Sequence, residues 1–334
     1  MSLPHRRARS RGRTAVVLAL VSLLVVALDR TPIAAPLAAT PPVSWPTTST
    51  STSTSTTTTA TTVVAAAPAP APAPPSPPPP VWAGKGMWIY QPELTDDGDG
   101  ASIVARAVAD GITTIYVRTD SSHDGLTVDW LVDFLPVAHA AGIRVVGWDF
   151  PELNDIGADV TRGVAAILTA GADGSHLDGF AADIETESEG TNLTADTAAA
   201  YGAALRAAAP LTPLIACVPR PSGYYQGFYP YAEAVESFDA IAPMVYWIDD
   251  DPVYDVVEAM MFLGPFGKPV APIGQAFDGA AAGGPEGMPS AEQLAAFAAT
   301  AQAGGAAGVS FWSWQHADDA TFAAIAAMPE VGLG

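Results

Sequence analysis

The sequence predicts an α/β protein whose one folded domain is a (β/α)8 barrel, and two observations predict it. From residue 84 onward, short apolar runs alternate strictly with Ala-rich amphipathic runs, eight of each. Such alternation is typical of a parallel sheet with right-handed crossovers. The domain that contains these runs, residues 81–334, has the size at which eight units close into a barrel. The alternative, an open doubly wound sheet, usually carries a Gly-rich phosphate loop after its first strand, and this chain has none there.

The expected elements follow one another in strict order along the domain. Strands are expected over residues 86–90, 114–118, 144–150, 179–185, 213–218, 240–247, 269–274 and 308–314. Helices are expected over residues 101–110, 131–141, 159–170, 195–208, 229–237, 252–263, 291–302 and 320–327. A Gly stands just before the next strand at four of the junctions, where it suits a left-handed helix cap: Gly111, Gly142, Gly267 and Gly305.

The first 80 residues predict export followed by a linker. Five Arg side chains and no acid precede an apolar run at residues 15–28, which is the pattern of an export signal. Residues 1–39 are therefore expected to be a cleaved signal peptide or, alternatively, an N-terminal membrane anchor. Residues 40–80 are first rich in Thr and Ser and then rich in Pro, which predicts a disordered linker, such as a stalk through a cell wall. The domain is expected outside the cell, either secreted or anchored to the outer face of the membrane.

The charge of the domain limits its partners. Residues 1–80 hold six of the 14 Lys and Arg residues and one of the 35 acids, so residues 81–334 carry 8 basic and 34 acidic residues, a net charge of −26. This excludes nucleic acid as an expected partner. Contact with a membrane is expected only through the N-terminal anchor, and the domain is expected to be a monomer. No Cys and His residues have the spacing of a zinc site, so we expect neither a metal nor a cofactor.

The clearest functional signal is the run from Leu177 to Glu185, which reads as a buried strand that ends in two acids. Alternate side chains of a strand point the same way, so Asp183 and Glu185 are expected side by side, about 7 Å apart. A neighbouring carboxylate raises a carboxyl pKa, which suits a general acid. Alone, such a pair is more often two solvent-facing acids at a strand end. Its place on the fourth strand of a barrel favours catalysis, because barrel active sites lie at the C-terminal ends of the strands.

The other strand ends supply aromatic and polar side chains that suit the binding of a sugar. The expected substrate-binding residues are Tyr90, Trp148, Asp149, Met244, Trp247, Gln275, Trp312 and Trp314. For each aromatic residue alone, the alternative is packing in the core. Two cations at strand ends, Arg118 and Arg220, are expected either to hold an anionic sugar group or to pair with Asp149 or Asp183.

Three segments resemble glycoside hydrolase family 18, the chitinase-like TIM barrels. The family's D-G-x-D-x-D-x-E motif is similar to residues 178–185, its M-x-Y-D to residues 244–247, and its last strand with a Trp to residues 308–314. The chain departs from the family at Ala181, where the motif has its middle Asp, and at Trp247, where the family has Asp. The resemblance implies that Glu185 protonates the glycosidic oxygen, that Asp183 orients the substrate's N-acetyl group as the nucleophile, and that Tyr246 hydrogen-bonds that group.

These observations predict an enzyme: a glycoside hydrolase that cleaves a polysaccharide containing N-acetylhexosamine, chitin-like or peptidoglycan. Residues 272–278 contain no Glu, whereas ordinary retaining barrels carry a second Glu at the seventh strand, so the nucleophile is expected to come from the substrate. Three alternatives remain open. A non-catalytic carbohydrate-binding barrel is favoured by Ala181. A muramidase resembling the family 25 lysozymes is favoured by the Asp/Glu pair. A hydrolase of uncharged glucans is a third, weaker reading.

Overall fold

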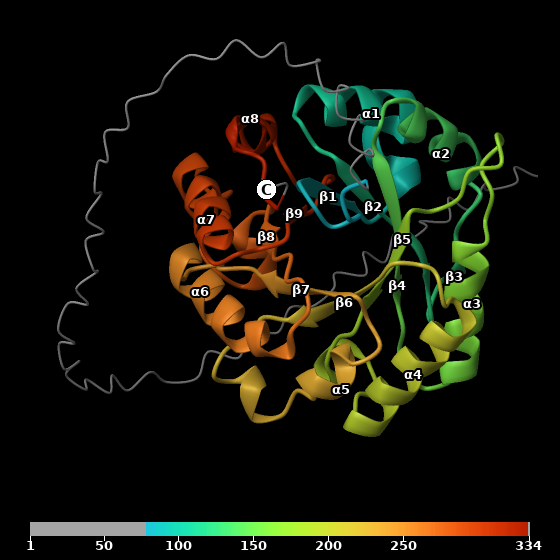
Figure 1. Ribbon diagram of the computed structural model, residues 1–334. Coiled ribbons are helices and arrows are strands. Elements are labelled where there is room, and N and C mark those ends of the chain that lie inside the picture. The colour runs from blue at the N-terminus through green and yellow to red at the C-terminus, as the bar shows by residue number, and fades with distance from the viewer. Residues whose placement is uncertain (1–77, 333–334) are drawn as a thin grey trace, which may run out of the picture. The chain divides into compact units, whose positions relative to one another are not determined.

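A computed structural model describes residues 78–332, which form a closed barrel of eight parallel strands (Figure 1). Strand β1 pairs with both β2 and β9, and this closes the ring. The strands are β1 (Lys85–Ile89), β2 (Thr114–Ser121), β4 (Arg144–Phe150), β5 (Gly179–Asp183), β6 (Leu214–Pro219), β7 (Ala240–Val245), β8 (Ile273–Gln275) and β9 (Val309–Trp312). The predicted fold class is confirmed. The predicted signal peptide or anchor lies outside the described residues, and so does the linker up to residue 77.

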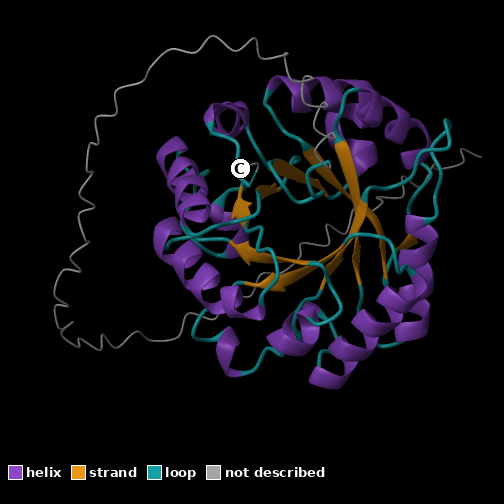
Figure 2. Ribbon diagram, viewed as in Figure 1, coloured by secondary structure: helices purple, strands orange, loops and turns teal. Residues whose placement is uncertain are grey.

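Eight helices surround the ring of strands in the described residues (Figure 2). They are α1 (Gly100–Ala109), α2 (Leu131–Ala140), α3 (Ile156–Ile167), α4 (Ala195–Ala208), α5 (Tyr231–Val235), α6 (Pro252–Leu263), α7 (Ala291–Ala303) and α8 (Asp319–Ala327). Most of them begin at a side chain that accepts a hydrogen bond from a backbone N–H of the first turn, which fixes where the helix starts. These caps are Asp99, Asp155, Thr194, Asp251, Ser290 and Asp318.

Short elements fill the connections between the strands and helices. One was not predicted: β3 (Gly125–Leu126) pairs antiparallel with the end of β2 as a small hairpin. The short 3₁₀ turns are η1 (Pro92–Gly98), η2 (Glu187–Glu189), η3 (Tyr225–Gly227), η4 (Gly264–Phe266) and η5 (Gly279–Ala282). Strand β5 ends at Asp183, two residues earlier than predicted, so Glu185 lies just beyond the strand.

The core has two parts, one on each face of the curved sheet. The part inside the barrel contains Trp88, Tyr116, Trp148, Ala181 and Cys217, among others. The larger part lies between the strands and the helices. Because side chains alternate between the two faces of a strand, each residue's parity decides whether it can reach a site inside the barrel.

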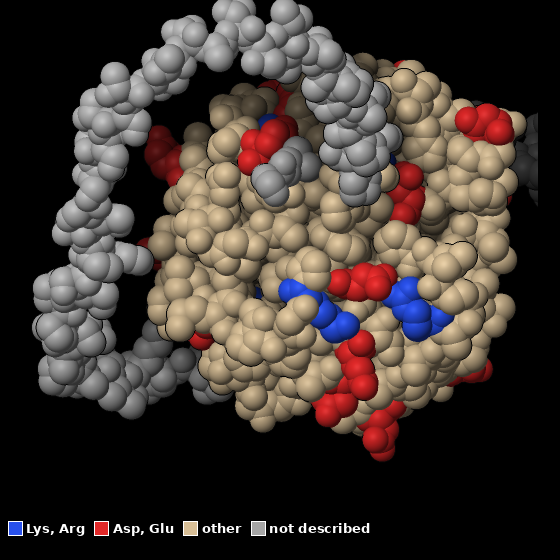
Figure 3. All heavy atoms as spheres, viewed as in Figure 1, with Lys and Arg blue, Asp and Glu red and all other residues tan. Residues whose placement is uncertain are grey.

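The charged groups are sparse on the face of the described domain shown in Figure 3. Most of this surface is uncharged, and its few Lys and Arg side chains lie next to Asp or Glu. Within the described residues, no helix is both long enough and apolar enough to cross a membrane.

Candidate active site

Strand β5 brings two acids to the C-terminal end of the barrel. Asp183 follows Ala181 on the interior face and is aligned with Cys217 of β6. The peptide between Asp183 and Glu185 is held from both sides. The N–H of Ile184 donates to the carbonyl oxygen of Cys217 (3.0 Å), and its carbonyl oxygen accepts a hydrogen bond from the Tyr229 hydroxyl (2.7 Å). These two bonds fix the direction in which both carboxyl groups leave the backbone.

The environment of the two acids favours their protonated forms. Burial raises the pKa of Asp183 to about 7, the charge of Glu189 adds to the rise, and Arg118 opposes it. Burial also raises the pKa of Glu185 well above its usual value, and the charges of Asp183 and Glu189 raise it further. Both influences favour the protonated form of Glu185, which is the form that a general acid needs.

Three further side chains surround the pair. Tyr246, which follows β7, has its pKa raised by burial and then by the charges of Asp183 and Glu185, so its hydroxyl lies within electrostatic reach of both. Burial, followed by the charges of Glu185 and Glu189, raises the pKa of Tyr225 to about 12. Tyr246 is among the residues predicted from the sequence, whereas Glu189 and Tyr225 are not. Those two stand on the turns η2 and η3, where no periodic pattern marks an inward position.

Aromatic rings also line the interior of the barrel, and one of them, Trp148, stands on β4 next to β5. Tyr90 lies 6.3 Å from Trp148 and 6.1 Å from Trp312, measured between ring centroids, and the last two are 5.4 Å apart. Met244 packs against the same interior cluster. The guanidinium of Arg118 sits 4.7 Å from the centre of the Tyr90 ring. The structure thus places four of the predicted binding residues, Tyr90, Trp148, Met244 and Trp312, inside the same barrel as the acids.

Three predicted binding residues point away from the interior, and we leave them out of the candidate site. Trp247 is 1% exposed and packs against Phe297 of α7, with 5.5 Å between ring centroids. Trp314 packs against Phe322 of α8 (5.1 Å). Asp149 lies in the outer layer, where it accepts a hydrogen bond from the Tyr201 hydroxyl of α4 (2.7 Å). Asp149 directly follows the inward residue Trp148 within β4, so it takes the opposite face of the strand.

The remaining predicted residues have structural partners. Gln275 is buried at the end of β8, where its Oε1 accepts from the backbone N–H of Ile248 (2.8 Å) and its Nε2 donates to the carbonyl oxygen of Phe277 (3.1 Å). It therefore holds two loops and has little capacity left for a ligand. Arg118 pairs with Asp124 (2.5 Å). Arg220 pairs with Asp255 and, at 3.7 Å, with Asp250, and not with either predicted acid.

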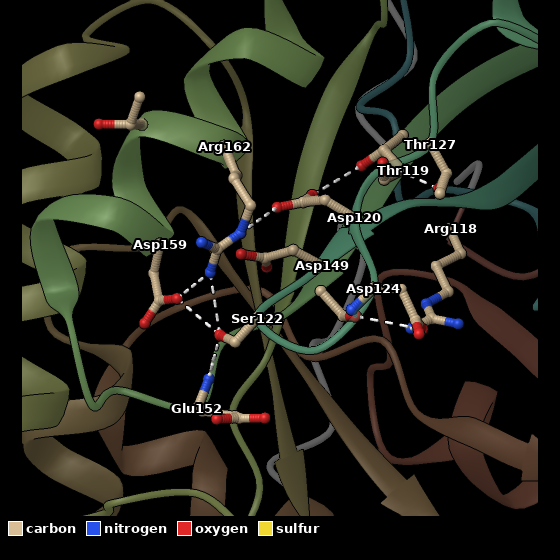
Figure 4. A network of polar contacts seen from close by, with 12 residues as sticks. Arg118, Thr119, Asp120, Ser122, Asp124, Thr127, Asp149, Glu152, Asp159 and Arg162 are labelled. Carbon is tan, nitrogen blue, oxygen red and sulfur yellow. Dashed lines mark hydrogen bonds and ion pairs between the residues drawn. The ribbon is translucent and has the colours of Figure 1, made fainter. Parts of the chain in front are cut away.

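Asp149 belongs to a buried acidic network behind β2 and β4 (Figure 4). Arg162 of α3 is the cation at its centre. Its Nη2 donates to the Ser122 hydroxyl (2.9 Å) and pairs with Asp159, and its Nε lies 3.8 Å from Asp120 Oδ2. Burial raises the pKa of Asp120 to about 7, and burial followed by the charge of Asp120 raises the pKa of Asp149 well above its usual value. The network stabilises the connection between the sheet and α3, outside the candidate site.

Among residues 78–332, no three His, Cys, Asp or Glu side chains are grouped so that they could hold a metal ion. The groups that the candidate site brings together are two carboxyls with raised pKa values, a tyrosine hydroxyl and several aromatic rings.

Comparison with solved structures finds the same barrel fold in several carbohydrate-active enzymes. It is similar to a chitinase from Chromobacterium violaceum (TM-score 0.52, 14% identity, 73% of this chain and 98% of that one). It is also similar to a chitinase domain from Pyrococcus furiosus (TM-score 0.53, 12% identity, 74% of this chain and 94% of that one). An endo-1,4-β-mannanase from Rhizomucor miehei is similar as well, with a TM-score of 0.53 and 10% identity over 69% of this chain and 86% of that one. The chain has a TIM-barrel fold like that of glycoside hydrolases. At these identities the likeness shows the fold alone, and no family model or curated protein matches the sequence.

Proposed function

We propose that the protein is a glycoside hydrolase that cleaves a polysaccharide containing N-acetylhexosamine, with Glu185 as the general acid. One observation carries the proposal: two carboxyl groups with raised pKa values stand together at the C-terminal end of β5. This is the end of the barrel where enzymes of this fold place their catalytic groups. The partly exposed interior rings of Tyr90 and Trp312 support a sugar as the ligand, since aromatic faces suit the C–H faces of pyranose rings.

The resemblance to family 18 supplies a mechanism for these residues. Glu185 gives its proton to the glycosidic oxygen as the bond from that oxygen to C1 breaks. The carbonyl oxygen of the substrate's own N-acetyl group attacks C1, while Asp183 accepts a hydrogen bond from the N–H of that group and Tyr246 donates one to its oxygen. Glu185 then takes a proton from the water that opens the cyclic intermediate. Asp183 Oδ1 is buried and has no hydrogen-bond partner in the described residues, which suits an acceptor that waits for the substrate.

The end of β8 supports a nucleophile supplied by the substrate. Retaining glycosidases of the usual kind need a second carboxylate about 5–5.5 Å from the acid. The strand β8 ends at Gln275, whose amide is occupied by two backbone groups. The lack of a carboxylate at this strand end favours the acetamido oxygen as the nucleophile and an N-acetylhexosamine as the substrate.

A second candidate function, a carbohydrate-binding barrel without catalysis, is favoured by Ala181. This residue is fully buried on the interior face, one step below Asp183. A methyl group there cannot take up or return a proton, so Asp183 lacks the carboxyl partner that the family motif provides. Retention of Glu185 in a protonating environment favours the hydrolase.

Two further proposals rest on the sequence alone. The partner of the protein is a polysaccharide, and the domain acts outside the cell, either secreted or anchored by residues 1–39. The Arg-rich start and the apolar run at residues 15–28 support this location.

The test is incubation of the full chain with the β-1,4-linked hexamer of N-acetylglucosamine and, separately, with purified peptidoglycan, followed by mass spectrometry. The expected result is shorter oligosaccharides from at least one of these substrates. If neither substrate yields products while the protein still binds the hexamer, the hydrolase proposal is wrong and the protein is a carbohydrate-binding barrel. If uncharged glucans are cleaved and these substrates are not, the requirement for an acetamido group is wrong.

A further inference from the structure

The loop that follows β6 carries three aromatic rings that contact one another, two of them exposed and one half-buried. We call Tyr224, Tyr225 and Phe228 the aromatic triad. Between ring centroids, Tyr224 lies 5.2 Å from Tyr225 and 5.1 Å from Phe228, and Tyr225 lies 5.7 Å from Phe228. Tyr224 is 57% exposed and Phe228 is 53% exposed. Large apolar rings that cluster on a surface are typical of binding sites.

The triad is connected to the acid proposed for catalysis. The charge of Glu185 is, after burial, the largest influence that raises the pKa of Tyr225, so the phenol stands within electrostatic reach of that carboxyl. Tyr229, next to Phe228 in the chain, donates its hydroxyl hydrogen to the carbonyl oxygen of Ile184, the residue before Glu185 (2.7 Å). The loop is thus tied to the segment that carries the acid, and the triad begins where the candidate site ends.

Hydrogen bonds within the loop hold the rings in place. Gln226 donates from its side chain to the carbonyl oxygen of Pro221 (2.6 Å) and from its backbone to that of Ser222 (2.9 Å). The carbonyl oxygen of Tyr225 accepts from the N–H groups of Phe228 (3.1 Å) and Tyr229 (2.8 Å). A surface that is already ordered loses little conformational entropy when it binds, so it suits recognition of a ligand.

We propose that the aromatic triad is a binding subsite for a sugar unit of the substrate, next to the unit held at Glu185. This proposal rests on the proposed function. The C–H groups on the face of a pyranose ring are weakly positive and complement the negative face of an aromatic ring. The occupant is therefore a β-1,4-linked N-acetylhexosamine chain long enough to reach from Glu185 to the loop after β6. Continuity with the candidate site favours this ligand over an unrelated protein partner.

A binding experiment tests the subsite separately from hydrolysis. In the full chain, Glu185→Gln serves as a slow parent, and the double change Tyr224→Ala and Phe228→Ala is added to it. Calorimetric titration with the hexamer of N-acetylglucosamine should show an affinity lower by about tenfold, which corresponds to about 1.4 kcal/mol. The matched control is Tyr254→Ala in the same parent, since Tyr254 of α6 is also exposed (66%) and contacts no ring of the triad among the described residues. Its affinity should equal that of the parent, and thermal unfolding should be the same for all three proteins.

Three results would overturn the subsite: no loss of affinity in the double variant, an equal loss in Tyr254→Ala, or no binding of the hexamer by the parent. Cleavage by the wild-type chain tests the proposed function separately from the subsite. If the wild-type chain binds the hexamer through the triad but releases no product, the proposed hydrolase function is wrong and the proposed subsite stands. If the wild-type chain cleaves the hexamer but the triad variant binds it as tightly as the parent, the proposed function stands and the proposed subsite is wrong.

Discussion

Replacing Glu185 by Gln is expected to lower kcat on an N-acetylhexosamine oligomer by about 10²–10⁴-fold and to leave KM nearly unchanged. The amide keeps the shape of the side chain but has no acidic proton to give to the leaving oxygen. The loss therefore falls on the transition state rather than on binding of the substrate. Steady-state kinetics with the hexamer of N-acetylglucosamine measures both constants.

The matched control is Glu187→Gln. Glu187 stands two residues further along, on η2, and its side chain is exposed to solvent. Its replacement removes one negative charge from the same loop and should leave kcat within about twofold, as expected for a surface change that touches no partner. If Glu185→Gln keeps more than a tenth of the activity, or if the two variants lose activity equally, Glu185 is not the acid.

Replacing Arg162 by Met is expected to destabilise the fold by about 3–5 kcal/mol at pH 8, because it leaves buried carboxylates without their cation. Arg162 is 22% exposed, and its partners Asp159 and Asp120 have side chains that are 3% and 1% exposed. Urea unfolding at constant pH measures the change. The control is Arg106→Met, whose ion pair with Asp319 lies at the surface, where such pairs contribute about 0–1 kcal/mol.

The loss caused by Arg162→Met should be smaller at pH 5 than at pH 8. The pKa of Asp120 in the folded protein is raised to about 7, from an ordinary value of 3.8. A raised pKa favours folding below the ordinary value, and that contribution is lost as the pH rises through 7. At pH 5 the folded protein therefore holds Asp120 as a neutral acid, which needs the arginine less. An equal loss at both pH values, or a loss no larger than that of Arg106→Met, would contradict this account of the network.

Periodicity in the sequence was sufficient to place the barrel but not the limits of its strands. All eight predicted strands and all eight predicted helices have counterparts, because each apolar run must be buried between an interior and a layer of helices. The limits depend on hydrogen bonds between neighbouring strands, which no local pattern records. This is why β5 ends at Asp183 while the apolar and acidic run continues to Glu185.

The face of each strand residue was predictable only where the strand stays regular. Trp148 and Asp149 are consecutive residues within β4, so the inward position of Trp148 already assigns Asp149 to the outer layer. Trp314 is different. It has the same parity as Trp312, but β9 ends at Trp312 and the chain then turns Trp314 toward Phe322 of α8. The parity rule fails where the strand ends.

The loop residues of the candidate site were beyond the reach of sequence patterns. Glu189 and Tyr225 stand on short turns, and their positions depend on the hydrogen bonds that shape those turns. A signal existed in the run of acids after β5 and in the aromatic cluster between residues 224 and 231. Only the fold brings these two segments to the same end of the barrel, since they follow the neighbouring strands β5 and β6.

The most direct test of the central claim, that Glu185 acts together with the substrate's own acetamido group, is the anomeric configuration of the first product. Proton NMR during early cleavage of the β-1,4-linked hexamer of N-acetylglucosamine reports it before mutarotation. Two displacements at C1, the first by the acetamido oxygen and the second by water, predict the β-anomer. A first product with the α configuration would mean direct attack by water and would contradict the mechanism.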